Sequence, residues 1–544
     1  MTRSIFLAQL AARIPKAQLQ GEADRPITGL THDSRAVRPG DLFVCLKGAA
    51  HDGHRFAVDA LAKGAAGLVV EEGGLEEAGV TSLPAGTPML TVADTRRALP
   101  LLACAFYGDP SYALTMVGVT GTNGKTTTTR MVAAILRAAG KRVGTIGTLG
   151  AELDGQPIPS EHTTPEADQL QSLLAQMRDG RADAVVMEVS SHALAQYRTD
   201  GIAFNAGIFT NITQDHLDYH KTMAEYFEAK ARLFAEIPVL YPRPDGAVFT
   251  SVINVAAWEG RDLVTRARGD ILTFTTGSNP AVLHAEDISL SPESVSFTAV
   301  YDSGSERFSF PVRLPIDGAF QVGNALAAIG AGLRLGVPKE TIAAGLAALP
   351  PVPGRFESVP TGGRGFSVIV DYAHTPDGLE NLLRSAHELH PQRLLVVFGC
   401  GGNRDRTKRP IMGHMAATQA DIAIVTSDNP RHEDPDAIIQ EILTGMDPTE
   451  GSSDDGDGKG EREEGRGNAA EIYVEPDRRA AIALALRQAR PGDLVLIAGK
   501  GHEDYQIVGD TVLSFDDRQV AREILDSLPP AQDSREQAAI PSSR

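Results

Sequence analysis

The sequence predicts an α/β fold with three domains and mostly parallel sheets. Short apolar runs that favour strands alternate with amphipathic helical stretches through most of the chain, and this alternation is typical of parallel sheets covered by helices. A proline-rich stretch at residues 349–357 interrupts the alternation, which then starts again. In the middle of the chain, one strand runs directly into a glycine-rich turn of the kind that binds phosphate. The length of 544 residues allows roughly three to four domains.

The predicted N-terminal domain, residues 1–112, mixes short helices and strands. Residues 1–16 are amphipathic and predict a first helix, because their apolar run is too short and too interrupted for a signal peptide. Residues 40–48 predict a strand, and residues 56–72 predict a helix, a glycine stop and a second strand.

The predicted central domain, residues 113–350, begins with a strand at 113–121. A helix follows at 125–140, and Gly140 is placed to end it. Three more buried strands and two long helices complete the pattern. The strands are expected at 142–148, 183–191 and 205–213, and the helices at 222–237 and 320–336.

The predicted C-terminal domain, residues 351–544, is a second α/β unit of Rossmann-like type. Its strands are expected near 366–371, 393–401, 421–427 and 493–499. The segment 447–468 has eight acidic and three basic residues and no aliphatic or aromatic one. We therefore expect a disordered insert there and, by the same reasoning, a disordered tail at 529–544.

Composition excludes several classes of protein. The formal net charge of -19 disfavours nonspecific binding to DNA, RNA or anionic lipid. The three cysteines lie far apart and form no CxxC pair, which indicates a reducing compartment without structural disulfides or zinc. No stretch of about twenty apolar residues could span a membrane. We expect a cytoplasmic monomer with small-molecule substrates and no nucleic-acid partner.

The glycine-rich turn is "GTNGKTT", residues 121–127. Two residues rather than four separate Gly121 from Gly124 and Lys125, so the loop is shorter than the usual P-loop. A strand, a turn and a helix start surround one anion with backbone N–H groups. Lys125 can neutralise the β- and γ-phosphates, and the Thr126 hydroxyl can bind Mg²⁺. A purely structural turn would not explain a lysine at the helix start.

Metal-binding side chains are expected at the carboxyl edge of the central sheet, where ligands bind in open α/β sheets. Glu188 ends a buried strand and can serve Mg²⁺; ordinary burial beside a basic residue is the alternative. Asp215, His216 and His220 follow the next strand.

Lys230 lies in an apolar stripe of its predicted helix, between Phe227 and Phe234. One interpretation is a lysine that extends its ammonium to solvent. The other is a lysine whose charge is suppressed for a purpose.

Five segments resemble the Mur ligases, the enzymes that build the peptidoglycan precursor. In the family's order they are "TGTNGKTTT" at 120–128, "EVSSHAL" at 188–194, "TNITQDHLDYH" at 210–220, "DYAHTPD" at 371–377 and "GKGHEDYQ" at 499–506. The resemblance covers nearly all of the chain except the insert and the tail. It is strongest to the members that add meso-diaminopimelate to UDP-N-acetylmuramoyl-L-alanyl-D-glutamate.

The resemblance implies an ATP-dependent ligase. ATP would phosphorylate the side-chain carboxylate of the D-glutamyl unit, and the incoming amine would displace phosphate from the acyl phosphate. It also implies that CO₂ carbamylates Lys230. Thr126 and Glu188 would then hold one Mg²⁺, and His216 with modified Lys230 a second. Catalytic roles fall to Lys125, Glu188, His216 and Lys230.

The resemblance also assigns binding residues. ATP would contact the residues Gly121, Thr122, Asn123, Gly124, Lys125, Thr126, Thr127, Asn324, Asp371 and His374. The muramoyl dipeptide would contact Ser34, the turn after Gly48, Thr163, Thr164, Ser190 or Ser191, Gln196 and Arg198. His162 stands where related enzymes can carry asparagine, which leaves its sugar contact open.

Specificity is expected in "TSDNPRHEDP", residues 426–435. A bidentate Arg431 would bind the second carboxylate of diaminopimelate, which lysine lacks; a merely solvated loop arginine is the alternative. The diaminopimelate-binding residues implied by the resemblance are Arg404, Asp428, Asn429, Pro430, Arg431, Gly499 and Glu503.

Two rival functions remain. One is a related ligase, either a lysine-adding Mur enzyme or a folylpolyglutamate synthase; Arg431 and the "HTTPE" segment at 162–166 argue against both. The other is a nucleotide-dependent switch, which would not need a third domain with its own carboxylate-binding arginines.

Overall fold

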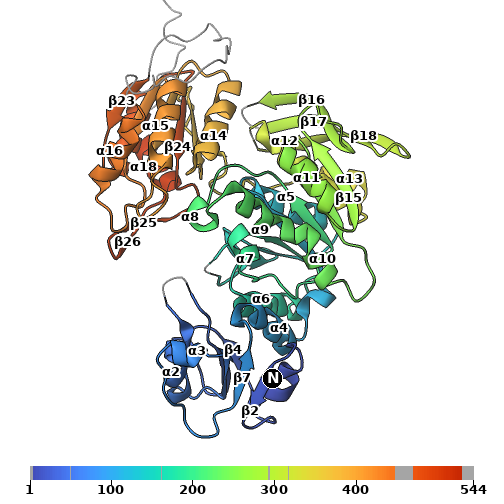
Figure 1. The fold of residues 1–544 in the computed structure, drawn as a ribbon. Helices are drawn as coiled ribbons and strands as arrows, with labels where there is room; N and C mark the ends of the chain where they lie inside the picture. Colours follow the sequence, from blue (N-terminus) through green and yellow to red (C-terminus); the bar gives the residue numbers. More distant parts are fainter. Residues whose placement is uncertain are drawn as a thin grey trace, which may run out of the picture.

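The computed structural model describes residues 4–48, 51–160, 162–291, 294–316, 318–446 and 470–529. The insert at 447–468 and the tail beyond Pro529, both expected to be disordered, lie outside the described residues. Three lobes follow one another along the chain, an N-terminal lobe in blue, a central lobe mainly in green and a C-terminal lobe in orange and red (Figure 1). Each lobe contains one large sheet with mainly parallel neighbours, so the predicted α/β class is confirmed.

The N-terminal lobe has a five-stranded sheet in the order β2-β7-β6-β5-β4, parallel except for β2. Its elements are β1 Ile5–Phe6, α1 Leu7–Ala11, β2 Gln18–Gln20, β3 Pro26–Ile27, β4 Gly29–Thr31, β5 Asp41–Val44, η1 Gly53–Phe56, α2 Ala57–Ala62, β6 Gly67–Glu71, α3 Gly74–Glu77, β7 Met89–Val92 and α4 Thr95–Tyr107. The helix predicted over residues 1–16 is wrong in extent. It covers only Leu7–Ala11 because Ile5 and Phe6 pair with β3 as a strand.

The central lobe has an eleven-stranded sheet in the order β11-β10-β9-β12-β8-β13-β14-β15-β16-β17-β18. Its strands are β8 Thr115–Thr120, β9 Val143–Gly147, β10 Gly150–Leu153, β11 Gln156–Ile158, β12 Ala184–Glu188, β13 Ala206–Phe209, β14 Thr250–Asn254, β15 Asp270–Thr275, β16 Leu283–Ser291, β17 Ser294–Asp302 and β18 Arg307–Leu314. Its helices are η2 Pro110–Ala113, α5 Lys125–Ala138, α6 Ala167–Asp179, α7 Ser191–Ala195, α8 Leu217–His220, α9 Met223–Ala235, α10 Ile237–Leu240, α11 Trp258–Arg266, α12 Phe320–Arg334 and α13 Lys339–Ala347. The four strands predicted first, β8, β9, β12 and β13, are adjacent and parallel, as expected.

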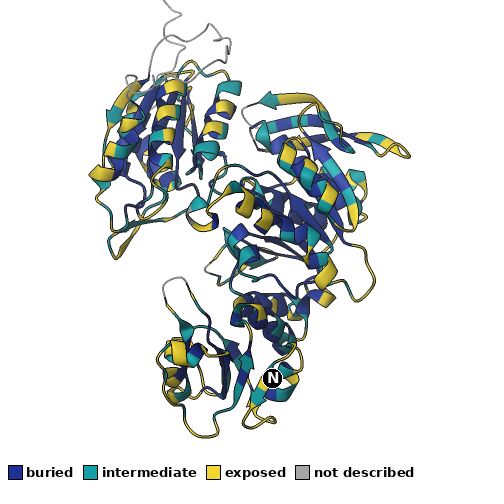
Figure 2. Ribbon diagram, viewed as in Figure 1, coloured by how far each residue is buried: buried dark blue, intermediate teal, exposed yellow. Residues whose placement is uncertain are grey.

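Helices cover both faces of the central strands. Successive side chains of a strand point to opposite faces, so Val117 of β8 packs with α5 and α12, while Met116 packs with α6 and α9 on the other side. Figure 2 shows these strands in the colour of buried residues. The strand ends are therefore held by packing on two faces, which fixes the loops that follow them.

The C-terminal lobe has a six-stranded sheet in the order β19-β20-β24-β21-β22-β23, parallel except for β19. Its elements are β19 Glu357–Ser358, β20 Ser367–Asp371, α14 Pro376–Glu388, β21 Leu394–Phe398, α15 Lys408–Gln419, β22 Ile422–Val425, α16 Pro435–Thr444, β23 Glu471–Val474, α17 Arg478–Gln488, β24 Leu494–Ala498, β25 Tyr505–Val508, β26 Thr511–Ser514 and α18 Asp517–Ser527. No helix in the described part of the chain is long and apolar enough to cross a membrane.

Candidate active site

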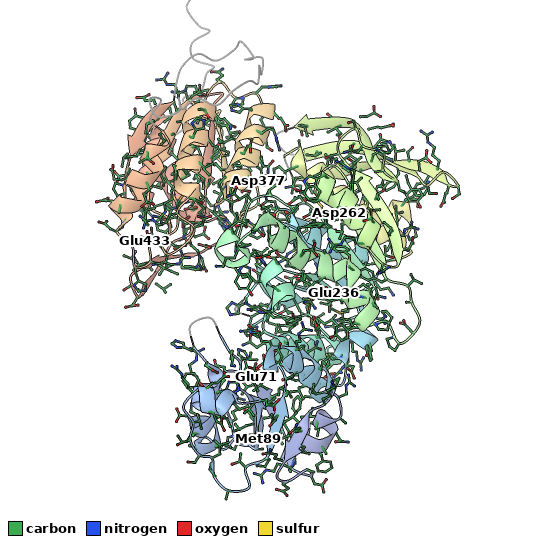
Figure 3. The ribbon with its side chains drawn as sticks, viewed as in Figure 1. Glu71, Met89, Glu236, Asp262, Asp377 and Glu433 are labelled. Carbon is green, nitrogen blue, oxygen red and sulfur yellow. The ribbon has the colours of Figure 1, made fainter. Side chains whose placement is uncertain are left out.

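A cavity of about 360 Å³ lies between the central and C-terminal lobes. Sixteen of the candidate residues named from the sequence line it: Thr122, Asn123, Gly124, Lys125, Thr126, Thr127, Thr163, Glu188, Ser190, Ser191, Asp215, His216, Lys230, Asn324, Asp371 and His374. The side-chain amide of Asn123 donates to Asp377 of α14 and joins the two lobes at the cavity. Figure 3 labels Asp377 at this boundary.

The glycine-rich turn is held in one conformation by its neighbours. Gly124 has a φ of +82°, and a Cβ there would come within 2.2 Å of Asn324 Oδ1. Only glycine therefore fits this position without displacing Asn324. The N–H groups of Thr122 and Asn123 donate to Asn211 O at 3.0 Å and Asn211 Oδ1 at 2.8 Å, and these bonds hold the turn in place. The turn leads directly into α5, and the N–H groups of a helix start can bind an anion.

Lys125 contacts the turn that precedes it. Its Nζ donates to Gly121 O at 3.0 Å and to Thr122 O at 2.7 Å. Burial lowers the pKa of Lys125, while Glu188 and Asp215 oppose that shift. Among the side chains that the structure describes, no carboxylate lies within ion-pair distance of Lys125. An anion in the cavity would supply the missing partner.

Lys230 of α9 is only 1% exposed, so the interpretation of a solvent-reaching lysine is wrong. Its Nζ donates to Gly121 O at 2.8 Å and lies 4.4 Å from the centre of the Tyr226 ring. Burial and the nearby charge of Lys125 lower the pKa of Lys230 well below its ordinary value. A lowered pKa favours the neutral amine, which is the form of lysine that attacks electrophiles.

Glu188 and Thr126 face the same cavity from β12 and α5. Glu188 is 1% exposed, and its carboxylate accepts from Thr148 N at 2.9 Å and Thr148 Oγ1 at 3.0 Å. One buried carboxylate and one hydroxyl are hard oxygen donors, and Mg²⁺ is usually held by one or two carboxylates together with substrate phosphates. The donor set therefore fits Mg²⁺. No group of three or more His, Cys, Asp and Glu side chains suited to a metal occurs within the described ranges.

Asp215, His216 and His220 lie after β13, as the sequence predicts. Burial lowers the pKa of His216 to about 4, although Asp215 Oδ2, 3.3 Å from its Nε2, opposes the shift. A neutral imidazole has a free lone pair for a metal. His220 is buried, and its Nε2 lies 3.0 Å from Ser191 Oγ.

Of the residues predicted for the muramoyl dipeptide, Thr163 and Ser190 line the cavity, and hydrogen bonds join Thr164, Gln196 and Arg198 to Ser190. Thr164 Oγ1 donates to Glu188 O at 2.9 Å and accepts from Ser190 N at 3.1 Å. Arg198 donates to Thr164 O at 2.9 Å and binds Gln196 Oε1 through Nη2 at 2.7 Å. Thr163 Oγ1 is 3.2 Å from Thr148 Oγ1, His162 is exposed, and Ser34 belongs to the N-terminal lobe.

The residues predicted for diaminopimelate gather in a separate cluster of the C-terminal lobe. Asn429 Nδ2 donates to Glu503 Oε2 at 2.8 Å, and a Cβ on Gly499 would lie 2.8 Å from Asp428 Oδ2. Burial and the neighbouring charge of Arg404 lower the pKa of Arg431. Pro430 lies between Asn429 and Arg431 in the same loop.

This cluster is connected to the cavity. Tyr372 lines the cavity, and its hydroxyl donates to Glu503 Oε1 at 3.5 Å. Beside it, Asp371 accepts backbone N–H groups from Phe356 at 2.7 Å and Ala373 at 2.8 Å. Burial lowers the pKa of His374 to about 4.

The sequence analysis missed two cationic residues. Arg355, in the proline-rich linker, donates to Thr126 Oγ1 at 3.3 Å and lies over the Tyr372 ring at 4.4 Å. Lys500 is 0% exposed and lies 3.3 Å from both Asn429 Oδ1 and Glu503 Oε2. Each carries a signal in the sequence: Arg355 follows Gly354 in the stretch interpreted only as a linker, and Lys500 lies inside the segment "GKGHEDYQ".

Comparison with known proteins places the chain in a family. Sequence models match the Mur ligase family catalytic domain at residues 26–107, the Mur ligase middle domain at 119–332 and the Mur ligase glutamate ligase domain at 354–501. A relative from Syntrophomonas wolfei is 44% identical over 519 residues, which cover 95% of this chain and 99% of the relative. The chain belongs to the Mur ligase family.

Other relatives agree with this membership. The relative from Syntrophomonas wolfei is named UDP-N-acetylmuramoyl-L-alanyl-D-glutamate–2,6-diaminopimelate ligase, and one of the same name from Gloeobacter violaceus is 45% identical, covering 92% of this Mur ligase and 94% of the relative. A solved structure of that name superposes with a TM-score of 0.64 at 31% identity, covering 96% and 99% of the two chains. A Mycobacterium tuberculosis folylpolyglutamate synthase shares the fold, with a TM-score of 0.57 at 18% identity over 80% of this chain and 96% of that chain.

We expect Gly124→Ala to weaken ATP binding by this Mur ligase about tenfold or more, because the added Cβ would displace Asn324 and strain the turn. Calorimetric titration with a non-hydrolysable ATP analogue measures the loss. Gly140→Ala is the matched control: Gly140 also has a positive φ, of +76°, but no atom lies within 4 Å of the place that its Cβ would take. Equal losses in the two variants would show that backbone strain, not the contact with Asn324, governs the effect.

Proposed function

We propose that this Mur ligase uses ATP to join meso-2,6-diaminopimelate to UDP-N-acetylmuramoyl-L-alanyl-D-glutamate. The observation that carries the proposal is the connection between two sites. A phosphate-binding turn opens into a cavity shared by two lobes, and Tyr372 in its wall reaches the Glu503 cluster of the C-terminal lobe. A ligase needs this arrangement because an activated acid and an amine must meet. The relatives' printed names support the same reaction.

The first step is the phosphorylation of the D-glutamyl carboxylate. A carboxylate is a poor electrophile, and transfer of the γ-phosphoryl group gives it a good leaving group, with ADP released. Two anions must approach each other, so the turn's N–H groups and Lys125 balance charge on the phosphates. Arg355 stands opposite on the linker, in hydrogen-bond contact with Thr126. Catalysis is therefore mainly positioning and electrostatic stabilisation.

The second step is attack by the amine on the acyl phosphate. The neutral amine nitrogen forms a bond to the acyl carbon, and a tetrahedral intermediate develops. Inorganic phosphate then leaves with the bonding electron pair, and the nitrogen loses one proton, which the phosphate can accept. Tyr372 lies on the path between the Glu503 cluster and the cavity. Closure of the C-terminal lobe on the central lobe would exclude water, which otherwise hydrolyses the acyl phosphate.

Thr126 and Glu188 would hold a first Mg²⁺, and His216 with Lys230 a second. Bound Mg²⁺ supplies charge neutralisation at the phosphate oxygens. Lys230 contributes to that set only as an anion, which carbamylation by CO₂ would provide. Its burial and lowered pKa support this modification, because a neutral amine is the species that reacts with CO₂.

Specificity for diaminopimelate rests on charge. Arg431 and Arg404 form a cationic pair that a second carboxylate would satisfy. Asp428 and Glu503 supply anionic oxygens for the distal ammonium. Lysine would leave the arginines without a partner, which disfavours the lysine-adding alternative. The likeness to a folylpolyglutamate synthase, at 18% identity, extends to the fold alone.

Phosphate release from ATP tests the proposal. Purified protein should release phosphate only when the UDP-linked dipeptide and diaminopimelate are both present. A panel of amino acids with the acceptor fixed should show diaminopimelate strongly preferred over lysine. Release with neither substrate would instead favour a nucleotide-dependent switch, and equal rates with lysine would favour a lysine-adding ligase.

We expect Arg431→Ala to raise the KM for diaminopimelate by about 10- to 100-fold, the loss typical of a charged hydrogen-bond pair. The KM for ATP should change less than about twofold. Steady-state phosphate release with one substrate varied at a time measures both. Arg406→Ala is the control, since Arg406 is an exposed arginine that pairs with Glu441. Equal losses for both substrates would contradict a carboxylate-binding role.

We expect Lys230→Ala to lose most activity and to regain part of it with added short carboxylic acids, which can enter the space of the missing carbamate. The measurement is phosphate release against acetate or formate concentration. Lys221→Ala, a change on the loop before α9, provides the control for salt effects. A lack of restoration at every concentration would count against the carbamate.

A further inference from the structure

One carboxylate of the central lobe binds a loop of the N-terminal lobe. Asp168, in the first turn of α6, accepts the backbone N–H of His32 at 3.1 Å and lies 2.9 Å from His32 Nδ1. The Asp168 side chain is 4% exposed and the His32 side chain 22%. The contact spans 136 positions of sequence and joins the two lobes.

The rest of this loop is braced from within. Thr31 Oγ1 accepts the N–H of Asp33 at 3.1 Å, and Asp33 Oδ1 accepts the N–H of Arg35 at 2.8 Å. Ser34, which is proposed to contact the UDP part of the substrate, lies between Asp33 and Arg35 in this loop. Its carbonyl oxygen accepts a hydrogen bond from Lys63 Nζ at 2.6 Å. His32 is therefore the residue through which this loop is hydrogen-bonded to the central lobe.

Asp168 also belongs to the segment that reaches the reacting end of the substrate. Residues 163–168 include Thr164, which bonds to the carbonyl oxygen of Glu188, and Glu166, which pairs with Arg198 at 2.8 Å. The segment 163–168 thus contacts three parts of the molecule: Glu188 at the end of β12, Arg198, and His32 in the loop of the N-terminal lobe. A substrate that spans the two lobes needs these contacts at a fixed separation.

We propose that Asp168 is a positioning residue that, through His32, fixes the loop at residues 31–34 for the UDP end of the substrate. The proposal rests on the proposed function, which supplies a substrate that spans both lobes. Asp168 does not contact the reacting atoms. Its loss should therefore affect the binding of the UDP moiety and leave chemistry at the cavity intact.

Charge strengthens the contact. Burial lowers the pKa of His32, but Asp168 and then Glu166 on the central lobe, with Asp33 on the loop itself, outweigh it, so the pKa is raised overall. A raised pKa in the folded protein means that the charged contact is complete at low pH. It weakens as pH rises through the raised pKa and the imidazole loses its proton.

The test compares Asp168→Asn with the wild type. Calorimetry with UDP alone should show affinity lower by about fivefold to tenfold, because the amide keeps one acceptor and loses the charge. In turnover, the KM for the UDP-linked dipeptide should rise by a similar factor, with kcat and the KM values for ATP and diaminopimelate within about twofold. In the wild type this KM should rise as pH rises through the raised pKa of His32, and Asp168→Asn should flatten that dependence.

Asp179→Asn, the same change at the exposed last residue of α6, is the matched control and should behave as the wild type. His32→Ala tests the contact from the other lobe, and the double variant should be no worse than the more affected single variant. Unchanged UDP affinity in Asp168→Asn, or independent losses that multiply in the double variant, would overturn the proposal. An inactive wild type that binds UDP through this contact would refute the proposed function alone.

Discussion

Two lysine side chains that line the cavity donate to a single backbone carbonyl, that of Gly121. Lys125 comes from the helix that follows the turn and Lys230 from α9, which lies on the other side of β8. Burial and the nearby charge of Lys125 lower the pKa of Lys230, and burial lowers the pKa of Lys125 as well. Anions would offset the positive charge of these two lysines, as the phosphates of a nucleotide and the proposed carbamate on Lys230 would do.

The C-terminal lobe completes the nucleotide site rather than lying apart from it. Arg355 bonds to Thr126 and covers Tyr372, while Asn123 bonds to Asp377. The linker between the lobes thus contributes the positive charge of Arg355 to the wall of the cavity. Arg355 and Tyr372 contact each other, and Tyr372 contacts Glu503 of the diaminopimelate cluster, so a movement of the C-terminal lobe would move all three together. We therefore expect the position of the amine to depend on nucleotide binding.

Much of this could be predicted from the sequence because it depends on local pattern. The strands and the shortened phosphate turn follow from apolar periodicity and glycine placement. Periodicity also places Lys230 in an apolar stripe, but it leaves open whether the ammonium reaches solvent, and the structure shows that Lys230 is buried. The contacts that depend on distant segments could not be predicted. Arg355 reaches Thr126 across 229 positions, and Asp168 reaches His32 across 136. The first helix is shorter than its amphipathic pattern predicts, because Ile5 and Phe6 pair with β3 as a strand. That pairing joins segments about 20 residues apart, so the local pattern does not reveal it.

The central claim is that the lysine-lined cavity brings the γ-phosphate of ATP against the D-glutamyl carboxylate. It is tested most directly by labelling both oxygens of that carboxylate with ¹⁸O and analysing the products of turnover by mass spectrometry. The account predicts that one ¹⁸O appears in the released inorganic phosphate and one stays in the new amide. Phosphate without ¹⁸O would mean that the carboxylate is never phosphorylated, and it would contradict the account.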